Sequence, residues 1–315
     1  MYIGVDGGGT KTAFILMDKE CNILATYQSD TGSYLAVGIE GVRTTLSQGI
    51  SYILSSANAD ISDVNYAFFG LPCYGEDQTM QQTLDLLPAT IMDKDKYSCN
   101  NDTVCGWAGS LACADGINIV AGTGSISYGQ NKGTSARCGG WGELFGDEGS
   151  GYWISREGLN VFTKMADGRL TPGPLHTLLK QHLDLDRDLD LPGIVLDQWL
   201  GERRKIAAIS TVVCEAARAG DIHAIDIYNR AGIELAEIVE ATRRQAKFDN
   251  DETVKLSYSG GIFNSEDMIL EPLIKALKSN YTLLKPRFSP AIGAALYAAK
   301  LDGRSFSEQI LSNLD

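Results

Sequence analysis

The chain has 315 residues, of which 44% are hydrophobic and 21% charged, and its formal net charge is −13. A chain of this length can form two domains with sizeable cores. Its acidic balance argues against nucleic acid and anionic membranes as partners. No apolar run approaches the roughly 18 residues of a membrane-spanning helix.

Seven cysteines lie at positions 21, 73, 99, 105, 113, 138 and 214, and none forms a C-x-x-C pair. Their odd number and apolar surroundings, with no basic leader segment at the start, predict a reduced cytoplasmic protein. His176, His182 and His223 have no acidic or Cys partner at ligand spacing, which argues against a His-based metal site. A catalytic base is therefore expected to be a carboxylate.

The first part of the chain alternates strand and helix patterns. Residues 2–29 predict three strands joined by hairpins, and apolar side chains at helical spacing follow between Gly38 and Ser56. The next segments predict a buried strand, a helix, a strand and a helix, at 66–71, 77–87, 97–99 and 102–114. Asp102 or Asn101 is the candidate N-cap of the last helix.

The pattern then restarts at strands 117–121, 125–129 and 134–138. A helical block interrupted by prolines fills 149–246, before a strand, a helix, a strand and a helix at 254–258, 266–278, 281–284 and 290–299. This repeat predicts an α/β protein with two lobes, residues 1–115 and 116–315, and a helical insertion in the second. The last helix could return to the first lobe.

Two glycine-rich turns each lead into a second strand: residues 6–12 (DGGGTKT) and 122–125 (GTGS). Glycine lets backbone N–H groups approach an anion, and Thr and Ser add hydroxyl donors. A Walker A loop or a dinucleotide fingerprint would have other spacing and open a helix. Two phosphate-binding turns predict a nucleotide-dependent phosphotransferase, and the alternative is two ordinary hairpins.

Four motifs give the chain a resemblance to a known family. Residues 6–12, 121–125 (AGTGS), 138–142 (CGGWG) and 146–150 (GDEGS) resemble the N-acetylglucosamine kinase family over essentially the whole chain. Glucosamine kinases and ATPases that activate 2-hydroxyacyl-CoA dehydratases belong to the same wider group. The resemblance implies two RNase H-like lobes of the actin-like ATPase and sugar kinase fold, with ATP and Mg²⁺ as cofactors.

The resemblance also implies roles for individual residues on the nucleotide side. Asp6 resembles the carboxylate on the magnesium side, acting through water. The residues that resemble nucleotide-binding positions are Gly8, Gly9, Thr10, Lys11, Thr123, Gly124, Ser125, Gly220, Gly260 and Gly261.

Asp102 matches the family's catalytic base, and phosphoryl transfer needs a carboxylate to orient or deprotonate the acceptor hydroxyl. Its alternative role is a simple N-cap. Gly139, Gly140, Trp141 and Asp147 match the sugar-binding loops. The neighbouring carboxylate of Glu148 is a further candidate for hydrogen bonding to sugar hydroxyls, although only one of the two acids need do so. The alternatives are a solvated acidic loop for Asp147 and Glu148, and a place in the core for Trp141.

One position departs from the family pattern. The family usually has Asn after the third strand, where this chain has Ser33, which offers one hydroxyl in place of a carbonyl and an amide. N-acetylglucosamine, phosphorylated at its 6-hydroxyl, is the first expectation for the acceptor, and N-acetylmuramic acid, glucosamine and another hexose are alternatives.

Two other functions compete with a sugar kinase. A dehydratase-activating ATPase would hold an iron–sulfur cluster at a dimer interface, with Cys99 and Cys138 as candidate ligands. A regulator without turnover would lack the acidic base, and Asp102 is present. The expected partner is a small-molecule sugar, and a homodimer is left open.

Overall fold

The computed structural model describes residues 1–314. They divide into two compact units: a first unit of residues 1–115 with the segment that begins at Lys285, and a second unit of Gly116–Leu284. From its sequence, the segment from Lys285 was predicted to belong to the second lobe, with only its last helix returning to the first. It belongs to the first unit because helix α10 (Pro290–Leu301) packs on strand β1 and helix α3 there.

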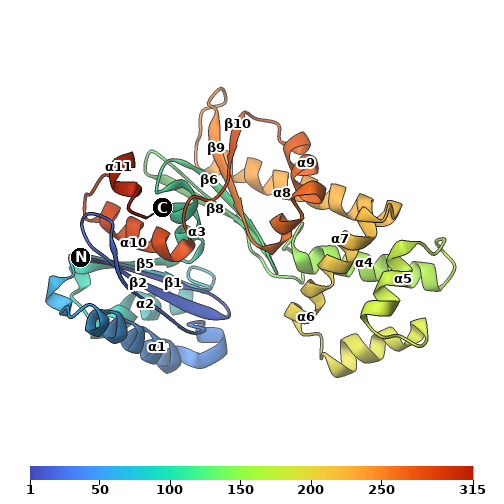
Figure 1. The fold of residues 1–315 in the computed structure, drawn as a ribbon, viewed down its shortest axis with the longest axis horizontal. Helices are drawn as coiled ribbons and strands as arrows, with labels where there is room; N and C mark the ends of the chain where they lie inside the picture. Colours follow the sequence, from blue (N-terminus) through green and yellow to red (C-terminus); the bar gives the residue numbers. More distant parts are fainter. Residues whose placement is uncertain (315) are drawn as a thin grey trace. The chain divides into compact units, whose positions relative to one another are not determined.

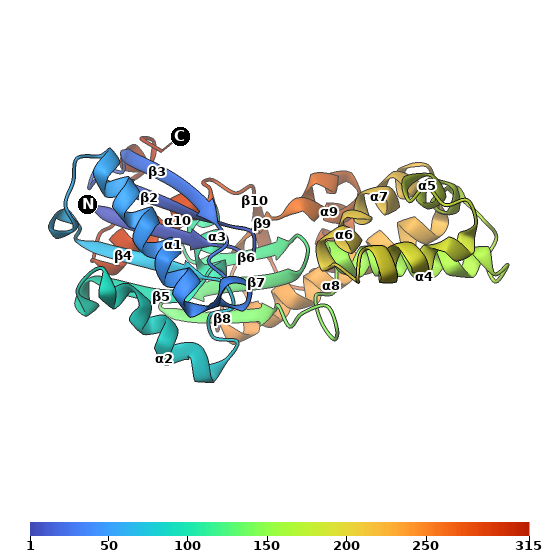
Figure 2. The ribbon, with the colours of Figure 1, turned by 90° about the horizontal axis from the view of Figure 1, so that it is seen from below.

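The first unit is built on a five-stranded sheet in the order β3-β2-β1-β4-β5. The hairpins β1-β2 and β2-β3 are antiparallel, whereas β1-β4 and β4-β5 pair in parallel. In Figure 2 helix α1 lies in front of this sheet. The elements are β1 (Tyr2–Gly7), β2 (Lys11–Met17), β3 (Ile23–Asp30), α1 (Tyr34–Ser56), β4 (Tyr66–Leu71), α2 (Gln78–Leu86), β5 (Tyr97–Asn101), α3 (Thr103–Leu111), α10 and α11 (Glu308–Leu311).

Both faces of the first sheet are covered by helices. Ile3 and Val5 of β1 belong to a buried core that includes Val42 and Leu46 of α1. On the opposite face α10 approaches so closely that a Cβ on Gly4 would lie 2.2 Å from the amide nitrogen of Ala295. Burial on both faces explains why β1 is a continuous apolar run without polar alternation.

Three sequence predictions in the first unit need correction. Helix α1 starts at Tyr34, ahead of the predicted start at Gly38, and a kink at Gly38, with φ +68°, separates this short first stretch from the predicted helix. The predicted helix 102–114 ends at Leu111, because Ala112 and Cys113 have positive φ angles of 49° and 60°. Strand β5 continues two residues beyond its predicted end at Cys99, which brings it directly to Asp102.

The second unit repeats the same sheet, in the order β10-β9-β6-β7-β8. Here too two antiparallel hairpins come first, and two parallel strands follow beside the first strand. The repeat predicted from the sequence is confirmed. The elements, labelled in Figure 1, are β6 (Gly116–Ala121), β7 (Ser125–Asn131), β8 (Thr134–Gly139), α4 (Gly151–Ala166), α5 (Pro174–His182), α6 (Arg203–Ala208), α7 (Ser210–Arg218), α8 (Ile222–Gln245), β9 (Val254–Ser259), α9 (Glu266–Ala276) and β10 (Tyr281–Leu284).

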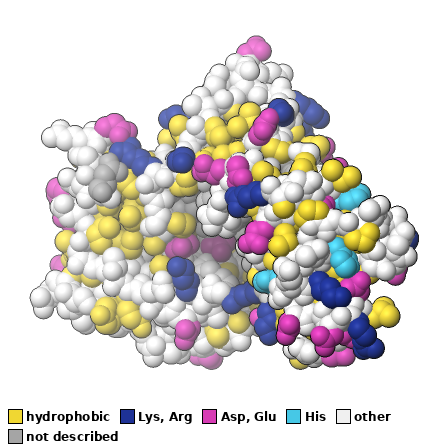
Figure 3. All heavy atoms as spheres, turned by 45° about the vertical axis from the view of Figure 1, so that its right-hand side comes forward, with side chains coloured by type: hydrophobic (Ala, Val, Ile, Leu, Met, Phe, Trp, Pro, Cys, Tyr) yellow, Lys and Arg dark blue, Asp and Glu magenta, His cyan; other side chains and the backbone are white. Residues whose placement is uncertain are grey.

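The predicted helical block of residues 149–246 consists of the five helices α4 to α8. Pro174 stands in the first turn of α5, and Pro192 precedes a short π-helical segment, Gly193–Gln198. The helices share one core with the sheet, from Ile119 on β6 to Ile154 and Val213. Figure 3 shows acidic and basic side chains mixed over the solvent face of this helical part.

Within residues 1–314, no helix has both the length and the apolar character needed to cross a membrane. All seven cysteines carry free thiols.

Candidate active site

The first glycine-rich turn joins β1 to β2 as a hairpin. Its backbone closes with the Gly8 amide donating to the Lys11 carbonyl at 2.8 Å. Gly9, Thr10 and Lys11 are exposed at the tip, where a ligand can reach their backbone. The Thr31 hydroxyl donates to the Gly8 carbonyl at 2.9 Å and fixes the turn from the far end of β3. A strand follows this turn, so its geometry differs from that of a Walker A loop.

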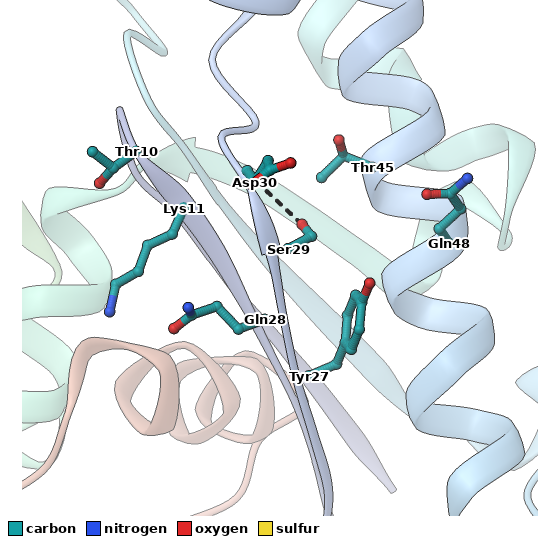
Figure 4. Close-up of a pocket in the computed structure, with 8 residues that line it drawn as sticks. All are labelled: Thr10, Lys11, Tyr27, Gln28, Ser29, Asp30, Thr45 and Gln48. Carbon is teal, nitrogen blue, oxygen red and sulfur yellow. Dashed lines mark hydrogen bonds between the residues drawn. The ribbon is translucent and has the colours of Figure 1, made fainter.

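A polar groove of about 440 Å³ runs beside this hairpin. Figure 4 shows Lys11 and Gln28 from two neighbouring strands on one side, and Thr45 and Gln48 of α1 on the other. The groove reaches Thr10 and Lys11 but neither Asp6 nor Asp102 lines it. It therefore borders the first glycine-rich turn, and both carboxylates lie outside it.

Asp6 lies at the end of β1 and is mostly shielded from solvent. Burial raises the pKa of Asp6 to about 6, although a hydrogen bond with the Cys105 side chain and the charge of Lys11 act in the opposite direction. A buried carboxylate of this kind gains from a nearby cation, which restores the stabilisation that water no longer provides. The chemistry of Asp6 therefore fits a place beside a divalent cation.

No group of three or more His, Cys, Asp or Glu side chains able to hold a metal occurs among residues 1–314. Mg²⁺ does not need such a cage, because it is usually bound by one or two carboxylates, water and substrate phosphates. Asp6, beside the first glycine-rich turn, fits this requirement.

Asp102 stands between β5 and α3. It occupies the N-cap position, but its side chain makes no capping hydrogen bond to the first turn of α3. Asn101 caps instead: its Oδ1 accepts hydrogen bonds from the Thr103 amide at 3.1 Å and from the Thr103 hydroxyl at 2.7 Å. The simple N-cap alternative for the Asp102 side chain is therefore wrong.

The thiol of Cys105 links Asp6 and Asp102. Burial raises the pKa of Cys105 well above its usual value, and the charges of both carboxylates raise it further. Gly70 makes room for this arrangement, because a Cβ there would lie 2.2 Å from Cys105 Sγ and 3.3 Å from the Asp102 Cα. The carboxyl ends of β1, β4 and β5 thus bring the two acidic residues together, as expected for an α/β site.

Ser33 is buried between β3 and α1, and its amide donates to Thr31 Oγ1 at 3.1 Å. Its neighbour Cys73 lies outside every sequence motif and was not predicted. Burial and the charges of Glu76 and Asp102 raise the pKa of Cys73 to about 11, while a hydrogen bond with Ser33 opposes the shift. Cys73 therefore interacts with both Ser33, the predicted sugar-binding residue, and Asp102, the predicted base. Its place in a turn directly after a buried strand was the signal available.

The second glycine-rich turn joins β6 to β7. The Gly151 amide donates to the Gly122 carbonyl at 2.7 Å, and the Tyr152 amide to the Thr123 carbonyl at 3.2 Å, so the first turn of α4 holds this hairpin. The Ser125 hydroxyl was predicted to face phosphate. It is buried and donates to the Glu148 carbonyl at 2.6 Å, so its hydroxyl fixes the loop before α4.

The predicted sugar loops follow β8. Gly139, Gly140 and Gly142 have φ angles of +77°, +71° and +91°. Residues other than glycine rarely adopt such backbone angles. The Gly140 amide donates to the Ser125 carbonyl at 2.8 Å, which joins this loop to the second hairpin. Trp141 is 74% exposed, so the alternative of a core tryptophan is wrong.

Asp147 is 2% exposed, so the alternative of a solvated acidic loop is wrong for this residue. It forms an ion pair with Arg203 at the start of α6 and accepts a hydrogen bond from the Ser125 amide at 3.3 Å. Burial raises the pKa of Asp147 above its usual value, although the charge of Arg203 and the hydrogen bond from the Ser125 amide oppose this shift. Glu148 contributes its backbone carbonyl to Ser125. Arg203 was not predicted, because it belongs to no motif.

The predicted nucleotide-side glycines differ in their surroundings. Gly260 has φ +102°, and a Cβ there would lie 2.4 Å from the Ala121 carbonyl oxygen. In contrast, a Cβ on Gly261 or Gly220 would meet no described atom within 4 Å. Gly260 is required by close packing of β9 on β6, whereas Gly261 and Gly220 leave open space for a ligand.

Comparison with known proteins matches residues 3–298 to the BadF/BadG/BcrA/BcrD ATPase family. The chain is 30% identical over 314 residues to the N-acetyl-D-glucosamine kinase of Dictyostelium discoideum, covering 95% of this chain and 97% of that one. It is 29% identical over 308 residues to the N-acetylmuramic acid/N-acetylglucosamine kinase of Clostridium acetobutylicum, covering 94% and 97%.

Among solved structures, the ROK family glucokinase from Streptomyces griseus, in complex with glucose and AMPPNP, matches with a TM-score of 0.55 at 17% identity. That match covers 95% of this chain and 99% of the glucokinase, and it shows a shared fold. The fold is the actin-like ATPase and sugar kinase fold. The chain belongs to the BadF/BadG/BcrA/BcrD ATPase family.

Proposed function

We propose that this ATP-dependent sugar kinase phosphorylates an amino sugar, with N-acetylglucosamine as the acceptor and its 6-hydroxyl as the nucleophile. The names of the two curated relatives support an amino sugar. The observation that carries the proposal is Asp102, a carboxylate at the end of β5 whose capping role is taken by Asn101. A carboxylate that makes no capping hydrogen bond to the helix, and whose charge acts on the Cys73 thiol, suits a catalytic base.

In the proposed reaction the acceptor hydroxyl oxygen forms a bond to the γ-phosphorus of ATP. The bond between that phosphorus and the bridging oxygen breaks, ADP leaves, and the Asp102 carboxylate accepts the hydroxyl proton. Phosphoryl transfer of this type depends mainly on positioning and on stabilising the charge of the phosphoryl group.

The two glycine-rich turns would hold the phosphates through their backbone amides, with Gly8 to Lys11 in one and Thr123 and Gly124 in the other. Gly220, Gly260 and Gly261 are proposed for the nucleoside end, where the last two follow β9 directly. Asp6 would hold Mg²⁺ through water, and bound Mg²⁺ would neutralise phosphate charge.

Ser33, Gly139, Gly140, Trp141, Asp147 and Glu148 are proposed for the acceptor. The exposed indole of Trp141 can cover a sugar ring. The Asp147 carboxylate is buried and paired with Arg203, and it would accept hydrogen bonds from sugar hydroxyls through its remaining lone pairs. N-acetylmuramic acid is the second candidate acceptor. It is named for the Clostridium acetobutylicum relative, and a Ser33 side chain shorter than the family's Asn would favour an acceptor with the larger lactyl group.

The test is ADP release with N-acetylglucosamine, N-acetylmuramic acid, glucosamine and glucose as acceptors. We expect N-acetylglucosamine to exceed glucose in kcat/KM by about tenfold or more, because unpaired buried polar groups penalise the wrong ligand. NMR of the product should place the phosphate on the 6-oxygen. Equal or better activity on glucose would reject the amino sugar, and a preference for N-acetylmuramic acid would replace the first acceptor with the second.

A further inference from the structure

The guanidinium group of Arg203 bridges two carboxylates of the loop formed by residues 141–148. Its Nε lies 3.2 Å from Glu143 Oε2, and its Nη2 forms an ion pair with Asp147. Arg203 is the first residue of α6, and 56 residues separate it from Asp147. The contact therefore joins the helical insertion to the loop that follows β8.

The same ion pair lies against the second glycine-rich turn. A Cβ on Gly124 would lie 2.6 Å from Arg203 Nη2 and 2.9 Å from each Asp147 carboxylate oxygen. The Ser125 amide donates to Asp147 Oδ1 at 3.3 Å. Only glycine at position 124 leaves space for the pair, so the turn and the loop are built to contact each other.

The loop has little apolar burial to hold it in place. Leu144 is 84% exposed and Phe145 is 72% exposed. Trp141, at the start of the loop, is 74% exposed. The side chain of Asp147 is buried, whereas the Arg203 side chain is 39% exposed. Since a buried carboxylate is stable only when it is paired, Arg203 provides the anchor that the apolar side chains do not.

We propose that Arg203 is a positioning residue for the acceptor site, which fixes the 141–148 loop, with Trp141 and Asp147, onto the second phosphate turn. This inference rests on the proposed function, because it takes the loop as the acceptor side of the site. A role of Arg203 in binding the transferred phosphoryl group is the competing outcome. That role would lower kcat, whereas loss of a positioning residue weakens acceptor binding.

The first experiment needs no substrate. Hydrogen–deuterium exchange of the wild type, Arg203→Ala and Arg203→Lys should show faster exchange of residues 141–148 and of the Ser125 amide in Arg203→Ala, and a smaller increase in Arg203→Lys. Lys205→Ala is the matched control, since Lys205 lies on the same helix and pairs with Glu202 at 3.0 Å. Exchange unchanged in Arg203→Ala would overturn the proposed anchor, whatever the enzyme phosphorylates.

The second experiment is steady-state kinetics of the same variants with the best acceptor of the wild type. Arg203→Ala should raise the acceptor KM by about tenfold or more, because it leaves one partner of a buried charge pair alone. The KM for ATP and kcat should change by less than about threefold, Arg203→Lys should recover part of the loss, and Lys205→Ala should match the wild type. A fall in kcat at unchanged acceptor KM would overturn the positioning role in favour of phosphoryl contact.

A pH profile separates positioning from general loss of structure. Asp147 faces Arg203 from α6, Glu143 and Glu148 of its own loop, and the Ser125 amide. Without Arg203 the pKa of Asp147 rises further, so the acceptor KM of Arg203→Ala should increase as the pH falls from 8 to 6, more steeply than in the wild type. The double variant Arg203→Ala/Asp147→Asn should lose that dependence. A wild type inactive on every amino sugar would reject the proposed function. The hydrogen–deuterium exchange result would still test whether Arg203 fixes the 141–148 loop.

Discussion

Asn101, and not its neighbour Asp102, caps helix α3. Its Oδ1 accepts two hydrogen bonds from Thr103, one from the amide at 3.1 Å and one from the hydroxyl at 2.7 Å. The Asn101 cap stabilises the start of the helix, and the Asp102 side chain makes no capping hydrogen bond. The stability of α3 and the chemistry proposed for Asp102 can therefore be tested separately.

Asp102→Asn should lower kcat by roughly 10²- to 10⁴-fold, because the amide keeps the size of the side chain but cannot accept the proton. Its unfolding midpoint in urea should stay close to that of the wild type, and ATP binding measured by calorimetry should persist. Near-normal kcat would move the search for the base to Asp147 and Glu148.

Asn101→Ala should show the opposite signature. It removes the cap and should destabilise the protein by about 1 kcal/mol, measured by urea unfolding. The activity that remains below the unfolding transition should exceed that of Asp102→Asn by a wide margin. If Asn101→Ala were the more damaging change for kcat in the folded enzyme, the division of roles between the two residues would be wrong.

Asp6→Ala should lower magnesium-dependent ATP turnover by at least about tenfold and leave the circular dichroism spectrum unchanged. Asp95→Ala is the control, because Asp95 is an exposed acidic residue of the same unit that lies outside the groove. Kinetics unchanged at saturating magnesium would remove Asp6 from the site.

Gly260 and Gly261 form a matched pair. Gly260→Ala places a methyl group 2.4 Å from the Ala121 carbonyl oxygen at φ +102°, and should destabilise the protein by about 2 kcal/mol or more. Gly261→Ala meets no described atom within 4 Å and should fold as the wild type. If the nucleoside lies against this backbone, Gly261→Ala raises the KM for ATP, and an unchanged value argues against that placement.

Ser33→Ala should raise the acceptor KM by about three- to tenfold, the effect of one lost hydrogen bond, with little change in the KM for ATP. Ser33→Asn restores the residue usual in the family, and the ratio of kcat/KM for N-acetylmuramic acid to that for N-acetylglucosamine should fall. Acceptor kinetics insensitive to both changes would place the sugar away from Ser33.

Glu240 of α8 gives a pH-dependent test of the second unit. Burial acts to raise the pKa of Glu240, but hydrogen bonds from the Lys278 and Ser279 amides, at 2.7 and 2.9 Å, and from the Ser279 hydroxyl outweigh it, so the pKa is lowered. A lowered folded-state pKa means that this stabilisation is present above the unfolded-state pKa and lost as the pH falls through the folded-state value.

Glu240→Gln should therefore destabilise the protein by about 1 to 2 kcal/mol at pH 7, since hydrogen bonds to a charged acceptor are the stronger ones. The difference from the wild type should shrink as the pH falls from the unfolded-state pKa through the lowered folded-state pKa. Urea unfolding at pH 7 and across this lower range measures it, and Glu237→Gln, an exposed position on the same helix, is the control. A difference that does not depend on pH would contradict the role of the charge.

The sequence predicted those parts of the fold that depend on local signals. Glycine runs between apolar segments identified both hairpins, and the repeated strand order identified two lobes. The position of Asp102 was also predicted, because it follows a buried strand. What could not be predicted was which of two adjacent polar residues caps α3, since Asn101 and Asp102 are both good N-cap residues.

Contacts between segments that are distant in the sequence could not be predicted either. Arg203 lies in a helix with two further basic residues and no motif, and its partner Asp147 is 56 residues away. Nothing in the local pattern distinguishes it from a surface arginine. Cys73 was missed for a related reason, because its importance comes from Ser33 and Asp102, which reach it from other strands.

The return of the chain to the first unit at Lys285 sets the order in which the protein can be completed during synthesis. Residues 116–284 are contiguous and have their own core, so they can fold as soon as they leave the ribosome. The first sheet must wait, because Gly4 packs against Ala295 and Trp107 against Tyr297, both on α10. The part of the enzyme that is made first is therefore the last to be finished.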